Sequence, residues 1–480
     1  MARAALNLKQ AGYQAFAKSR LAHWNLIPRF LERKQGGKYY HKRLIEIYSF
    51  LTLPGQRVLE IGCGHGDLLA AVQPAFGLGV DFSSQIVIEA QKRHPTLHFC
   101  LMDANALALN GPFDVIIFSD LLNDVWDVQT VFEQIQSLVT PRTRIILNSY
   151  SLLWEQPLAL MKRLQLATPT LYQNWLTVGD LSNLLNLAGF EVIRSWPEIL
   201  FPLPLLPWLF NRLLVRLWPF YHLALTNFIV AQPDDCRRTV KQPTVSVVIP
   251  ARNEAGNIKA LFERVPAMGQ KTELVFVEGH SRDDTYQQIE QAMRDHPQRC
   301  ASLYRQRGTG KGDAVRLGFE KASGDILMIL DADMTVSPED LPKFYQAIVE
   351  GKGEFINGVR LVYPMEKQAM RFLNLLGNKF FSLVFTWLLG QPIRDTLCGT
   401  KVLWRSDYQK IVANRSYFGD FDPFGDFDLL FGAAKLNLNI VDMPIRYRER
   451  TYGTTNIQRW KHGWLLMRMV LFAANRIKFV

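Results

Sequence analysis

Apolar and polar positions fall into two separate series along the chain. From Arg57 to about Val230, short apolar runs alternate with helical patterns, which is the rhythm of a parallel β-sheet covered by helices. A second series begins at residue 245, after a polar, proline-bracketed stretch over 233–243 that is typical of a linker. The pattern predicts two Rossmann-like α/β domains, over residues 1–232 and 244–480, with helices in the first 50 residues.

The bulk composition narrows the class of protein. A chain of 480 residues is too long for one hydrophobic core, and 48% hydrophobic with 21% charged residues is ordinary for folded domains. The five cysteines are scattered and odd in number, without a CxxC pair, which argues against a disulfide framework or a zinc site and suits a reducing cytoplasm. We find no signal-peptide pattern and no run of about 20 apolar residues that would span a membrane.

The net charge of +11 calls for an acidic partner. A basic excess can serve nucleic acid, anionic lipid or phosphorylated substrates. The sequence contains no nucleic-acid-binding module, and the basic residues near the C-terminus are interleaved with Trp and Leu. We therefore expect lipid and phosphate, and not nucleic acid, as partners.

A glycine-rich turn opens the first series. In VLEIGCGHGDLL (58–69) a buried strand leads into Gly62, Gly64 and Gly66 and then into a helix. Glycines let the backbone turn sharply and approach a ligand closely, with helix N–H groups facing it. Asp81 ends the next strand, 19 positions after Gly62, where a carboxylate can accept from two ribose hydroxyls. A dinucleotide-binding domain would also place an acid there, so the spacing alone leaves the ligand open.

The order of motifs is more specific than the turn. VLEIGCGHGDLL, GVDFS, LMDANAL (101–107) and FDVIIFSDLLNDVWD (113–127) together resemble class I S-adenosylmethionine-dependent methyltransferases, over about residues 40–232. The resemblance implies S-adenosylmethionine as cofactor. It assigns the glycine turn to the methionine portion, the acid after strand two to the ribose and the acid of the third motif to adenine. The implied cofactor residues are Glu60, Gly62, Gly64, Gly66, Asp81 and Asp103.

The methyl acceptor is less defined. Methyl transfer from a sulfonium is mainly positioning, and a base is needed only if the acceptor loses a proton. Asp120, Asn123 and Asp124 follow the fourth strand where a substrate should lie, although a helix cap and a solvated face explain them equally well. A catalytically inactive binding or scaffold module is the rival hypothesis for this half. The intact turn and Asp81 count against it.

An apolar insertion departs from the usual pattern of this fold. Residues 199–222, ILFPLPLLPWLFNRLLVRLWPFYH, stand where a short connection is expected, and they are dense in Leu, Pro and Trp. Two interpretations are equally favoured: a lid packed on the domain, or a surface that touches membrane or admits a lipid substrate.

The strongest chemical signal lies in the second series. In ILMILDADMTVSPEDL (326–341) a buried strand carries Asp331 and Asp333 to its end. Two carboxylates one residue apart can share a hard divalent cation, Mg²⁺ or Mn²⁺, that also binds a diphosphate. Such a cation neutralises the charge that builds on a leaving nucleotide. We expect Asp331 and Asp333 to be both catalytic and metal-binding.

The motifs around this pair resemble family 2 glycosyltransferases of the GT-A fold, in particular the polyprenyl-phosphate sugar synthases. VSVVIPARNEAGNI (245–258), VFVEGHSRDDT (275–285) and GTGKGDAVRLGFEKASGD (308–325) carry the likeness, which spans about 244–460. It implies inverting transfer of a hexose from a GDP- or UDP-sugar. Glu278 replaces the usual Asp, and Thr335 stands where a Gln often contacts the metal. The implied nucleotide-sugar residues are Pro250, Arg252, Glu254, Glu278 and Lys311.

Two kinds of acceptor remain open. Asp426 and Asp428 precede a helix and point, by analogy, toward the acceptor; a hydroxyl acceptor needs such a carboxylate base. A polyprenyl phosphate is already ionised and needs none, so cations that clamp its phosphate become important. The candidate clamps are Arg360, Lys401 and Arg448.

Two stretches indicate where a lipid acceptor would be met. Residues 372–393 are nearly all apolar but too short to span a bilayer, and 459–479 alternate Trp, Leu and Met with Arg and Lys, like an interfacial helix. We favour peripheral attachment to the cytoplasmic face of a membrane over burial of both stretches. The sequence thus predicts a bifunctional methyltransferase–glycosyltransferase of glycolipid or cell-envelope glycan synthesis. The oligomeric state cannot be predicted from it.

Overall fold

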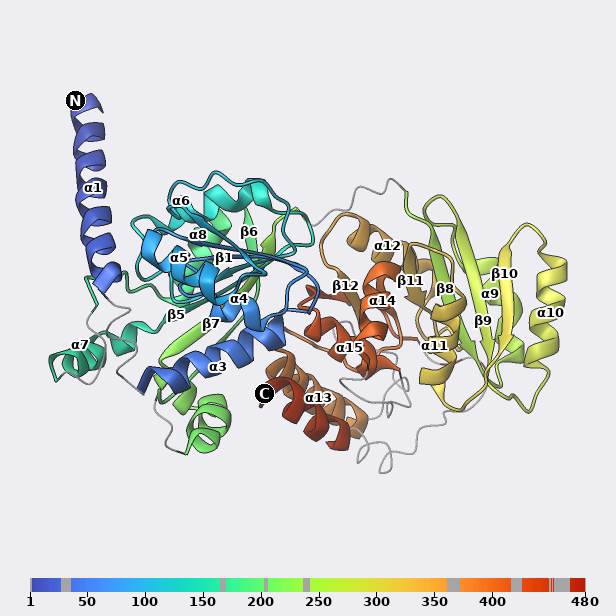
Figure 1. The fold of residues 1–480 in the computed structure, drawn as a ribbon. Helices are drawn as coiled ribbons and strands as arrows, with labels where there is room; N and C mark the ends of the chain where they lie inside the picture. Colours follow the sequence, from blue (N-terminus) through green and yellow to red (C-terminus); the bar gives the residue numbers. More distant parts are fainter. Residues whose placement is uncertain are drawn as a thin grey trace. The chain divides into compact units, whose positions relative to one another are not determined.

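The computed structural model describes residues 2–26, 36–164, 170–202, 206–235, 242–360, 372–415, 425–448, 450, 452 and 467–479. The chain forms two compact units, Met1–Asp235 with Phe479–Val480 and Cys236–Lys478. Each unit is built on its own twisted sheet with helices against it, the first blue to green and the second green to red in Figure 1. The two predicted α/β domains are therefore confirmed. Within the predicted linker, residues 236–241 lie outside the described residues.

The first unit has a seven-stranded sheet in the order β3-β2-β1-β4-β5-β7-β6. All neighbouring strands pair in parallel except β7, which runs antiparallel to both β5 and β6. The strands are β1 (Arg57–Ile61), β2 (Phe76–Asp81), β3 (His98–Leu101), β4 (Val115–Phe118), β5 (Arg144–Tyr150), β6 (Phe190–Glu198) and β7 (Thr226–Pro233). The principal helices are α1 (Ala2–Leu26), α3 (Gly36–Leu51), α4 (Asp67–Ala71), α5 (Ser84–Arg93), α6 (Val128–Gln134), α7 (Glu155–Arg163) and α8 (Val178–Leu187).

Both faces of this sheet are buried, which explains why its strands are apolar runs and do not alternate with polar residues. Successive strand residues point to opposite faces, so Leu59 and Val58 belong to two different core clusters. One cluster contains Phe132 of α6 and Leu181 of α8, and the other contains Tyr48 of α3. The helices contribute apolar residues at helical spacing to these clusters, and the strands contribute apolar residues to both faces of the sheet.

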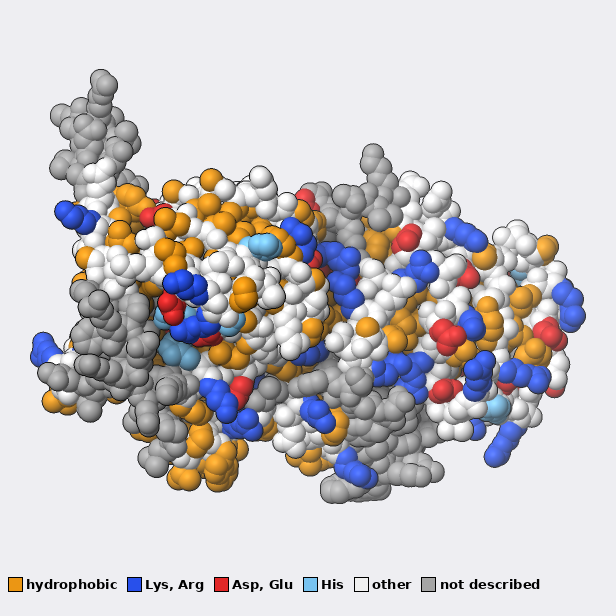
Figure 2. Space-filling model, viewed as in Figure 1, with side chains coloured by type: hydrophobic (Ala, Val, Ile, Leu, Met, Phe, Trp, Pro, Cys, Tyr) orange, Lys and Arg blue, Asp and Glu red, His pale blue; other side chains and the backbone are white. Residues whose placement is uncertain are grey.

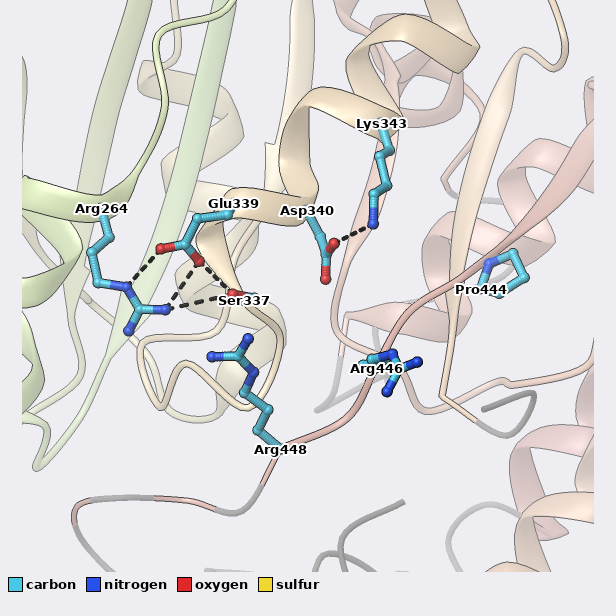
Figure 3. Close-up of a pocket in the computed structure, with 8 residues that line it drawn as sticks. All are labelled: Arg264, Ser337, Glu339, Asp340, Lys343, Pro444, Arg446 and Arg448. Carbon is cyan, nitrogen blue, oxygen red and sulfur yellow. Dashed lines mark hydrogen bonds and ion pairs between the residues drawn. The ribbon is translucent and has the colours of Figure 1, made fainter. Parts of the chain in front are cut away.

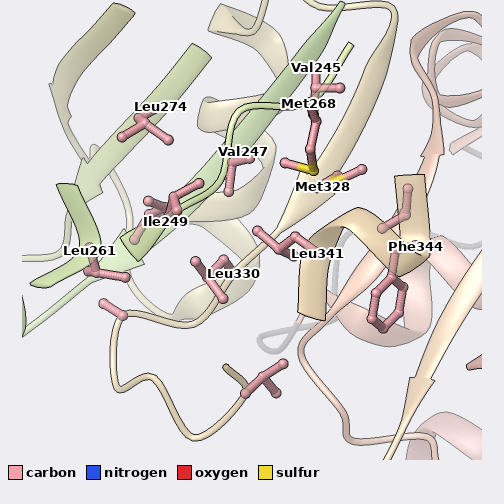
Figure 4. Packing of buried hydrophobic residues seen from close by; sticks show 14 of the residues in the cluster. Val245, Val247, Ile249, Leu261, Met268, Leu274, Met328, Leu330, Leu341 and Phe344 are labelled. Atoms are coloured by element: carbon pink, nitrogen blue, oxygen red, sulfur yellow. The ribbon is translucent and has the colours of Figure 1, made fainter. Parts of the chain in front are cut away.

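The second unit has a seven-stranded sheet in the order β10-β9-β8-β11-β13-β12-β14, in which β13 runs antiparallel to both of its neighbours. The strands are β8 (Val245–Ala251), β9 (Thr272–Glu278), β10 (Cys300–Arg305), β11 (Ile326–Ile329), β12 (Phe355–Val359), β13 (Lys401–Trp404) and β14 (Ile440–Pro444). The principal helices are α9 (Ile258–Arg264), α10 (Thr285–Asp295), α11 (Lys311–Lys321), α12 (Leu341–Val349), α13 (Phe372–Leu389), α14 (Arg405–Ala413) and α15 (Asp426–Lys435). Figure 4 shows β8, β9 and β11 contributing Val247, Leu274 and Met328 to one buried cluster.

Each sheet has a switch point in its strand order, next to its central strands. In the first unit, β1 lies between β2 and β4, so the chain leaves β1 toward one side and later returns on the other. In the second unit, β8 lies in the same way between β9 and β11. Ligands of open α/β sheets bind at such switch points. The glycine turn after β1 and the Asp331–Asp333 pair after β11 both lie there.

The apolar stretches of the sequence form short or amphipathic helices. The insertion 199–222 contains the helical turns η3 (Trp208–Leu213), η4 (Leu214–Arg216) and η5 (Phe220–Leu223), and residues 203–205 are outside the described part. Helix α13 packs against η9 (Ala474–Lys478), while 459–466 are likewise outside it. Among the described residues, no helix combines the length and the hydrophobicity that crossing a membrane requires.

Candidate active sites

The glycine turn of the first unit leaves an open cradle. Gly62, Gly64 and Gly66 have φ of +76°, +50° and +78°, which side-chain-bearing residues rarely adopt. A Cβ on Gly66 would lie 2.5 Å from the Phe99 ring, so this glycine is required by packing. A Cβ on Gly64 would have no atom within 4 Å. The backbone at Gly64 therefore faces open space, as an approaching ligand requires.

Asp81 lies directly against this cradle. It is the last residue of β2, and its carboxylate accepts hydrogen bonds from the N–H of Gly64 at 3.2 Å and of Ser83 at 3.0 Å. Burial raises the pKa of Asp81, although these N–H donors oppose the shift. The Asp81 carboxylate and Gly64 of the turn, 17 residues apart in sequence, are therefore in direct contact.

The two other predicted acids of this unit differ in their surroundings. Glu60 is buried, and burial raises its pKa well above the ordinary value. Its Oε2 has no partner among the described residues. Asp103 follows β3; its carboxylate accepts from the N–H of Asn105 at 2.8 Å and from the hydroxyl of Tyr13 on α1. Tyr13 is a residue that the motif order did not point to, because α1 precedes all of the motifs.

The residues after β4 form a hydrogen-bonded network around Asp120. Asp120 has a φ of +54°, and its Oδ1 accepts from the hydroxyl of Tyr40 at 2.7 Å and from Nδ2 of Asn148 at 2.5 Å. Burial raises the pKa of Asp120. Asp124 accepts from Nε1 of Trp24 at 2.5 Å and pairs with Arg20. Neither acid stands on a solvated face, because side chains of α3 and β5 engage Asp120 and side chains of α1 engage Asp124.

The first unit fits S-adenosylmethionine on its own geometry. The open space at Gly64 can receive the methionine portion of the cofactor. The buried, unpartnered oxygen of Glu60 and the acceptor at Asp81 are of the kind that ammonium and hydroxyl donors satisfy.

The acidic pair of the second unit is held by cations. Asp331 pairs with Nζ of Lys311 at 2.6 Å, and Asp333 pairs with Nη2 of Arg450 at 2.7 Å. The hydroxyl of Thr335 donates to Oδ1 of Asp333 at 2.8 Å, so this residue orients the carboxylate. Lys311 begins α11, and the neighbouring carboxylates raise its pKa against the effect of burial. Arg450 is a residue to which the sequence motifs did not point.

These two carboxylates fit a divalent cation as part of a larger ligand set. They are hard oxygen donors at one strand end, which Mg²⁺ and Mn²⁺ accept. No cluster of three or more Asp, Glu, His or Cys side chains suited to a metal occurs among the described residues. The described residues thus supply two carboxylate ligands, and phosphate oxygens and water are ligands that can complete the coordination of such a cation.

Two glycines allow further elements to approach this pair closely. A Cβ on Gly399 would lie 2.1 Å from Oδ2 of Asp331 and 2.3 Å from Nζ of Lys311, so the loop before β13 lies directly on the ion pair. A Cβ on Gly425 would lie 2.7 Å from the Cα of Gly312, so the start of α15 lies against the start of α11. Neither glycine can be replaced without moving its neighbour.

This close approach places Asp426 beside Lys311 and Asp331. Asp426 is buried at the first position of α15, and its Oδ1 has no partner among the described residues. Burial raises the pKa of Asp426, while Lys311 and Lys401 oppose the shift and Asp331 adds to it. Asp428, two residues on, forms an ion pair with Arg415 at 3.0 Å. The two acids predicted together thus have different surroundings.

The predicted base and ribose residues line the loops after β8 and β9. Glu254 is buried, accepts from Asn257 Nδ2 at 2.7 Å and pairs with Arg450 at 3.4 Å; burial raises its pKa to about 7. Glu278 ends β9 and accepts from the N–H of Ser281 at 2.5 Å. Pro250 is half-buried at the end of β8, and Arg252 is exposed beside it. These residues stand at the same sheet edge as Asp331.

Three predicted acceptor cations have three different environments. Arg360 forms a fork on the Asp395 carboxylate, with Nε to Oδ2 at 2.7 Å and Nη2 to Oδ1 at 2.8 Å. Lys401 is fully buried and donates to Asn357 Oδ1 at 2.8 Å and to the carbonyl of Cys398 at 2.7 Å. Both cations are thus committed to internal partners. Arg448 is exposed and lines a pocket.

Comparisons with known proteins give each unit a family. Residues 13–195 match the model of a methyltransferase domain, and residues 246–411 match that of glycosyl transferase family 2. A dolichol-phosphate mannosyltransferase of Pyrococcus furiosus is 36% identical over 109 residues, 22% of this chain and 30% of its own. An undecaprenyl-phosphate 4-deoxy-4-formamido-L-arabinose transferase of Aeromonas hydrophila is 33% identical over 111 residues, 22% of this chain and 34% of its own. The chain thus spans about a third of the length of these two curated relatives.

Solved structures resemble each half at low sequence identity. An S-adenosylmethionine-dependent methyltransferase from Mesorhizobium loti is 18% identical and covers 40% of this chain and 96% of its own, with a TM-score of 0.32. A glucosyl-3-phosphoglycerate synthase from Mycobacterium tuberculosis, in complex with Mn²⁺, UDP and glucosyl-3-phosphoglycerate, is 18% identical and covers 49% and 80%, with a TM-score of 0.36. The protein carries a methyltransferase domain followed by a family 2 glycosyltransferase domain.

Proposed function

We propose that this chain, which joins a methyltransferase domain to a family 2 glycosyltransferase domain, transfers a hexose from a GDP- or UDP-sugar to a polyprenyl phosphate with inversion. The observation that carries the proposal is the Asp331–Asp333 pair with Lys311 at the carboxyl end of β11. The names of two relatives, acting on dolichol phosphate and undecaprenyl phosphate, support the acceptor class.

The donor is held from both sides of the sheet edge. In this proposal Glu254 and Glu278 bind the base and the ribose, and Lys311 meets the diphosphate; their contacts at the sheet edge that carries Asp331 support these roles. A divalent cation held by Asp331 and Asp333 would neutralise charge on the departing nucleotide. On binding of a diphosphate, Lys311 and Arg450 would exchange their carboxylate partners for phosphate oxygens, so that charge-assisted bonds would be kept. The sugar C1–O bond to the diphosphate breaks as the bond from C1 to the acceptor oxygen forms on the opposite face.

The acceptor side rests on Asp426. A phosphate oxygen is already anionic, so Asp426 then serves to position the acceptor and no proton has to be removed. A hydroxyl acceptor is the second candidate. The Oδ1 of Asp426, which has no partner among the described residues, and the raised pKa of this acid favour it, since a buried carboxylate of this kind suits a general base. Arg360 and Lys401 act as internal braces in this proposal, holding the 395–401 segment under the site.

One experiment separates the two acceptors. Asp426→Asn is assayed with a panel of nucleotide sugars and polyprenyl phosphates, with products identified by mass spectrometry. With a lipid phosphate acceptor we expect kcat to fall by less than about a hundredfold, because no base is lost. Asp428→Asn is the matched control of the same helix turn, since its partner is Arg415. A larger collapse of kcat in Asp426→Asn alone, with metal binding unchanged, would support the hydroxyl acceptor.

The methyltransferase domain completes the bifunctional proposal. S-adenosylmethionine bound in the cradle would supply an electrophilic methyl group, and Gly64, Asp81 and Asp103 would orient it. Asp120, hydrogen-bonded by Tyr40, stands where an acceptor proton could be removed. We place both activities in the synthesis of a glycolipid or cell-envelope glycan. Binding of S-adenosylmethionine by calorimetry is the test, and a chain that binds no cofactor would favour the scaffold alternative.

Exposed apolar side chains support a peripheral position on the cytoplasmic face of a membrane. Phe380 and Leu383 of α13 are 49% and 72% exposed, whereas Phe385 of the same helix is buried against Phe427 and Phe431. In the insertion, Trp208 and Trp218 are 59% and 75% exposed. Figure 2 shows hydrophobic side chains gathered over these green helices of Figure 1. Such faces suit the interface of a bilayer.

A further inference from the structure

A second cluster of cations lies in a pocket on the glycosyltransferase unit. The pocket has a volume of about 330 Å³, and we call it the basic pocket (Figure 3). Its residues come from the end of α9, the turn η7 (Pro338–Asp340), the start of α12 and the segment after β14. Its lining consists of Arg264, Ser337, Glu339, Asp340, Lys343, Pro444, Arg446 and Arg448.

The pocket carries more positive than negative charge. Its four cationic side chains face two carboxylates, and each carboxylate is already paired. Arg264 forms a fork on Glu339, with Nε to Oε1 at 2.8 Å and Nη2 to Oε2 at 3.0 Å, while Lys343 pairs with Asp340 at 2.6 Å. The Arg264 guanidinium holds the pKa of Glu339 down to about 2. Glu339 thus stays ionised and keeps Arg264 in a fixed position on the pocket wall.

Arg448 remains available for a ligand. Its guanidinium forms no ion pair within the described part of the chain, and Figure 3 shows it pointing from the segment after β14 toward Ser337. Arg446 lines the same pocket two residues earlier. The segment that carries both is fixed, because Tyr447 forms an antiparallel bridge with Val336 and the N–H of Arg448 donates to the carbonyl of Thr335 at 2.9 Å.

We propose that the basic pocket is an accessory binding site for the phosphate group of an anionic ligand. Planar guanidinium groups are donors that phosphate oxygens take, and the exposed Arg448 presents such a group to the pocket. The volume admits a phosphate together with the group that bears it. The site is separate from the donor diphosphate position, where the cation is Lys311.

The basic pocket is coupled to the catalytic loop through one short stretch of backbone. Thr335, whose carbonyl holds Arg448, also donates through its hydroxyl to Asp333. Arg450, two residues beyond Arg448, pairs with Asp333 itself. A phosphate bound at Arg448 therefore lies on the segment whose Arg450 pairs with Asp333.

The test uses inorganic pyrophosphate as probe, with the full chain, chelator present and binding measured by calorimetry. In a Lys311→Gln background, which weakens the donor site, pyrophosphate binding should persist. Adding Arg446→Gln with Arg448→Gln should weaken it at least about tenfold, since each lost arginine removes charge-assisted bonds. Arg294→Gln with Lys271→Gln, two exposed cations on α10 and before β9, removes the same charge and should leave binding unchanged.

Binding to vesicles distinguishes a lipid phosphate from a soluble phosphate as the ligand. Sedimentation with phosphatidylcholine vesicles containing phosphatidic acid should depend on Arg446 and Arg448 if the ligand is a lipid headgroup, and be indifferent to them if it is a soluble phosphate. The conservative pair Arg446→Lys with Arg448→Lys keeps the charge and should retain most of the binding, which guards against a folding defect. Equal pyrophosphate affinity in the two Gln pairs, or its complete loss in Lys311→Gln alone, would overturn the accessory site.

Discussion

Two carboxylates at the edge of the first sheet, Asp81 and Asp120, differ in their partners from the acidic pair at the edge of the second. Asp81 and Asp120 accept hydrogen bonds from neutral donors, namely backbone N–H groups, a tyrosine hydroxyl and an asparagine amide. Asp331 and Asp333 are paired with Lys311 and Arg450. The two sheets have equivalent switch points in their strand order, so the difference in the partners of these acids arises from the side chains that face them.

This difference matches the charge of the ligand proposed for each site. A cofactor with ribose hydroxyls and a sulfonium needs acceptors that retain negative charge, and cations beside them would repel it. A nucleotide diphosphate with a divalent cation needs carboxylates for the metal and cationic side chains for the phosphates. The carboxylates and the cations can exchange partners when the ligand binds. Two sheets of similar topology thus carry proposed sites for ligands of opposite charge.

The largest effect is expected where the metal acids are removed. Asp331→Asn or Asp333→Asn should abolish sugar transfer, because the cation loses half of its protein ligands. Binding of S-adenosylmethionine to the first unit should be unchanged. Product formation and cofactor calorimetry are measured on the same preparations. Turnover that survives in both variants with chelator present would contradict the metal site.

The next effect is steric and leaves every charge in place. Gly399→Ala puts a methyl group where Oδ2 of Asp331 and Nζ of Lys311 now lie, so the ion pair has to shift. A displacement of about 1 Å in a reacting constellation can cost on the order of a hundredfold in rate. We expect a loss of that order in kcat for sugar transfer. Gly377→Ala is the control, since its Cβ would meet nothing within 4 Å, and unchanged kinetics in Gly399→Ala would show that the loop does not bear on the pair.

A smaller effect is expected in the methyltransferase unit. Asp81→Ala should weaken S-adenosylmethionine binding at least tenfold, about 1.4 kcal/mol, through the lost bonds to ribose. Sugar transfer should not change. Asp67→Ala, a half-exposed acid of the neighbouring helix α4, serves as control. Equal cofactor affinity in the Asp81 and Asp67 variants would argue against the ribose role.

The smallest effect concerns pH and the stability of the second unit. The pKa of Glu254 is raised to about 7 by burial, so its stabilising contribution is present below its ordinary pKa of 4.5 and is lost as the pH rises through about 7. Glu254→Gln lacks this titration. Its melting temperature, relative to the parent chain, should therefore rise between about pH 4.5 and pH 7.5. A difference that stays constant over this range would contradict the raised pKa.

Much of the architecture could be predicted from the sequence because it depends on periodicity. The two α/β domains follow from apolar runs that alternate with helical patterns, since a strand buried on both faces must be apolar along its whole length. The glycine turn with Asp81 and the Asp331–Asp333 pair are also local features, because the carboxyl end of a parallel strand fixes where the next residues lie. For these residues, position in the chain implied position in the site.

Only the tertiary structure decided which side chains surround those acids. Lys401 and Arg360 look like free cations in the sequence, but burial forces each to find an internal partner, and the segment 395–401 supplies one for both. Asp426 and Asp428 look equivalent, yet the close contact of Gly425 with Gly312 leaves one of them beside Lys311 while the other pairs with Arg415. Tyr13 and Arg450 lie 90 and 117 residues from the acids that they engage. Contacts at such separations depend on how the elements pack, which local sequence patterns do not encode.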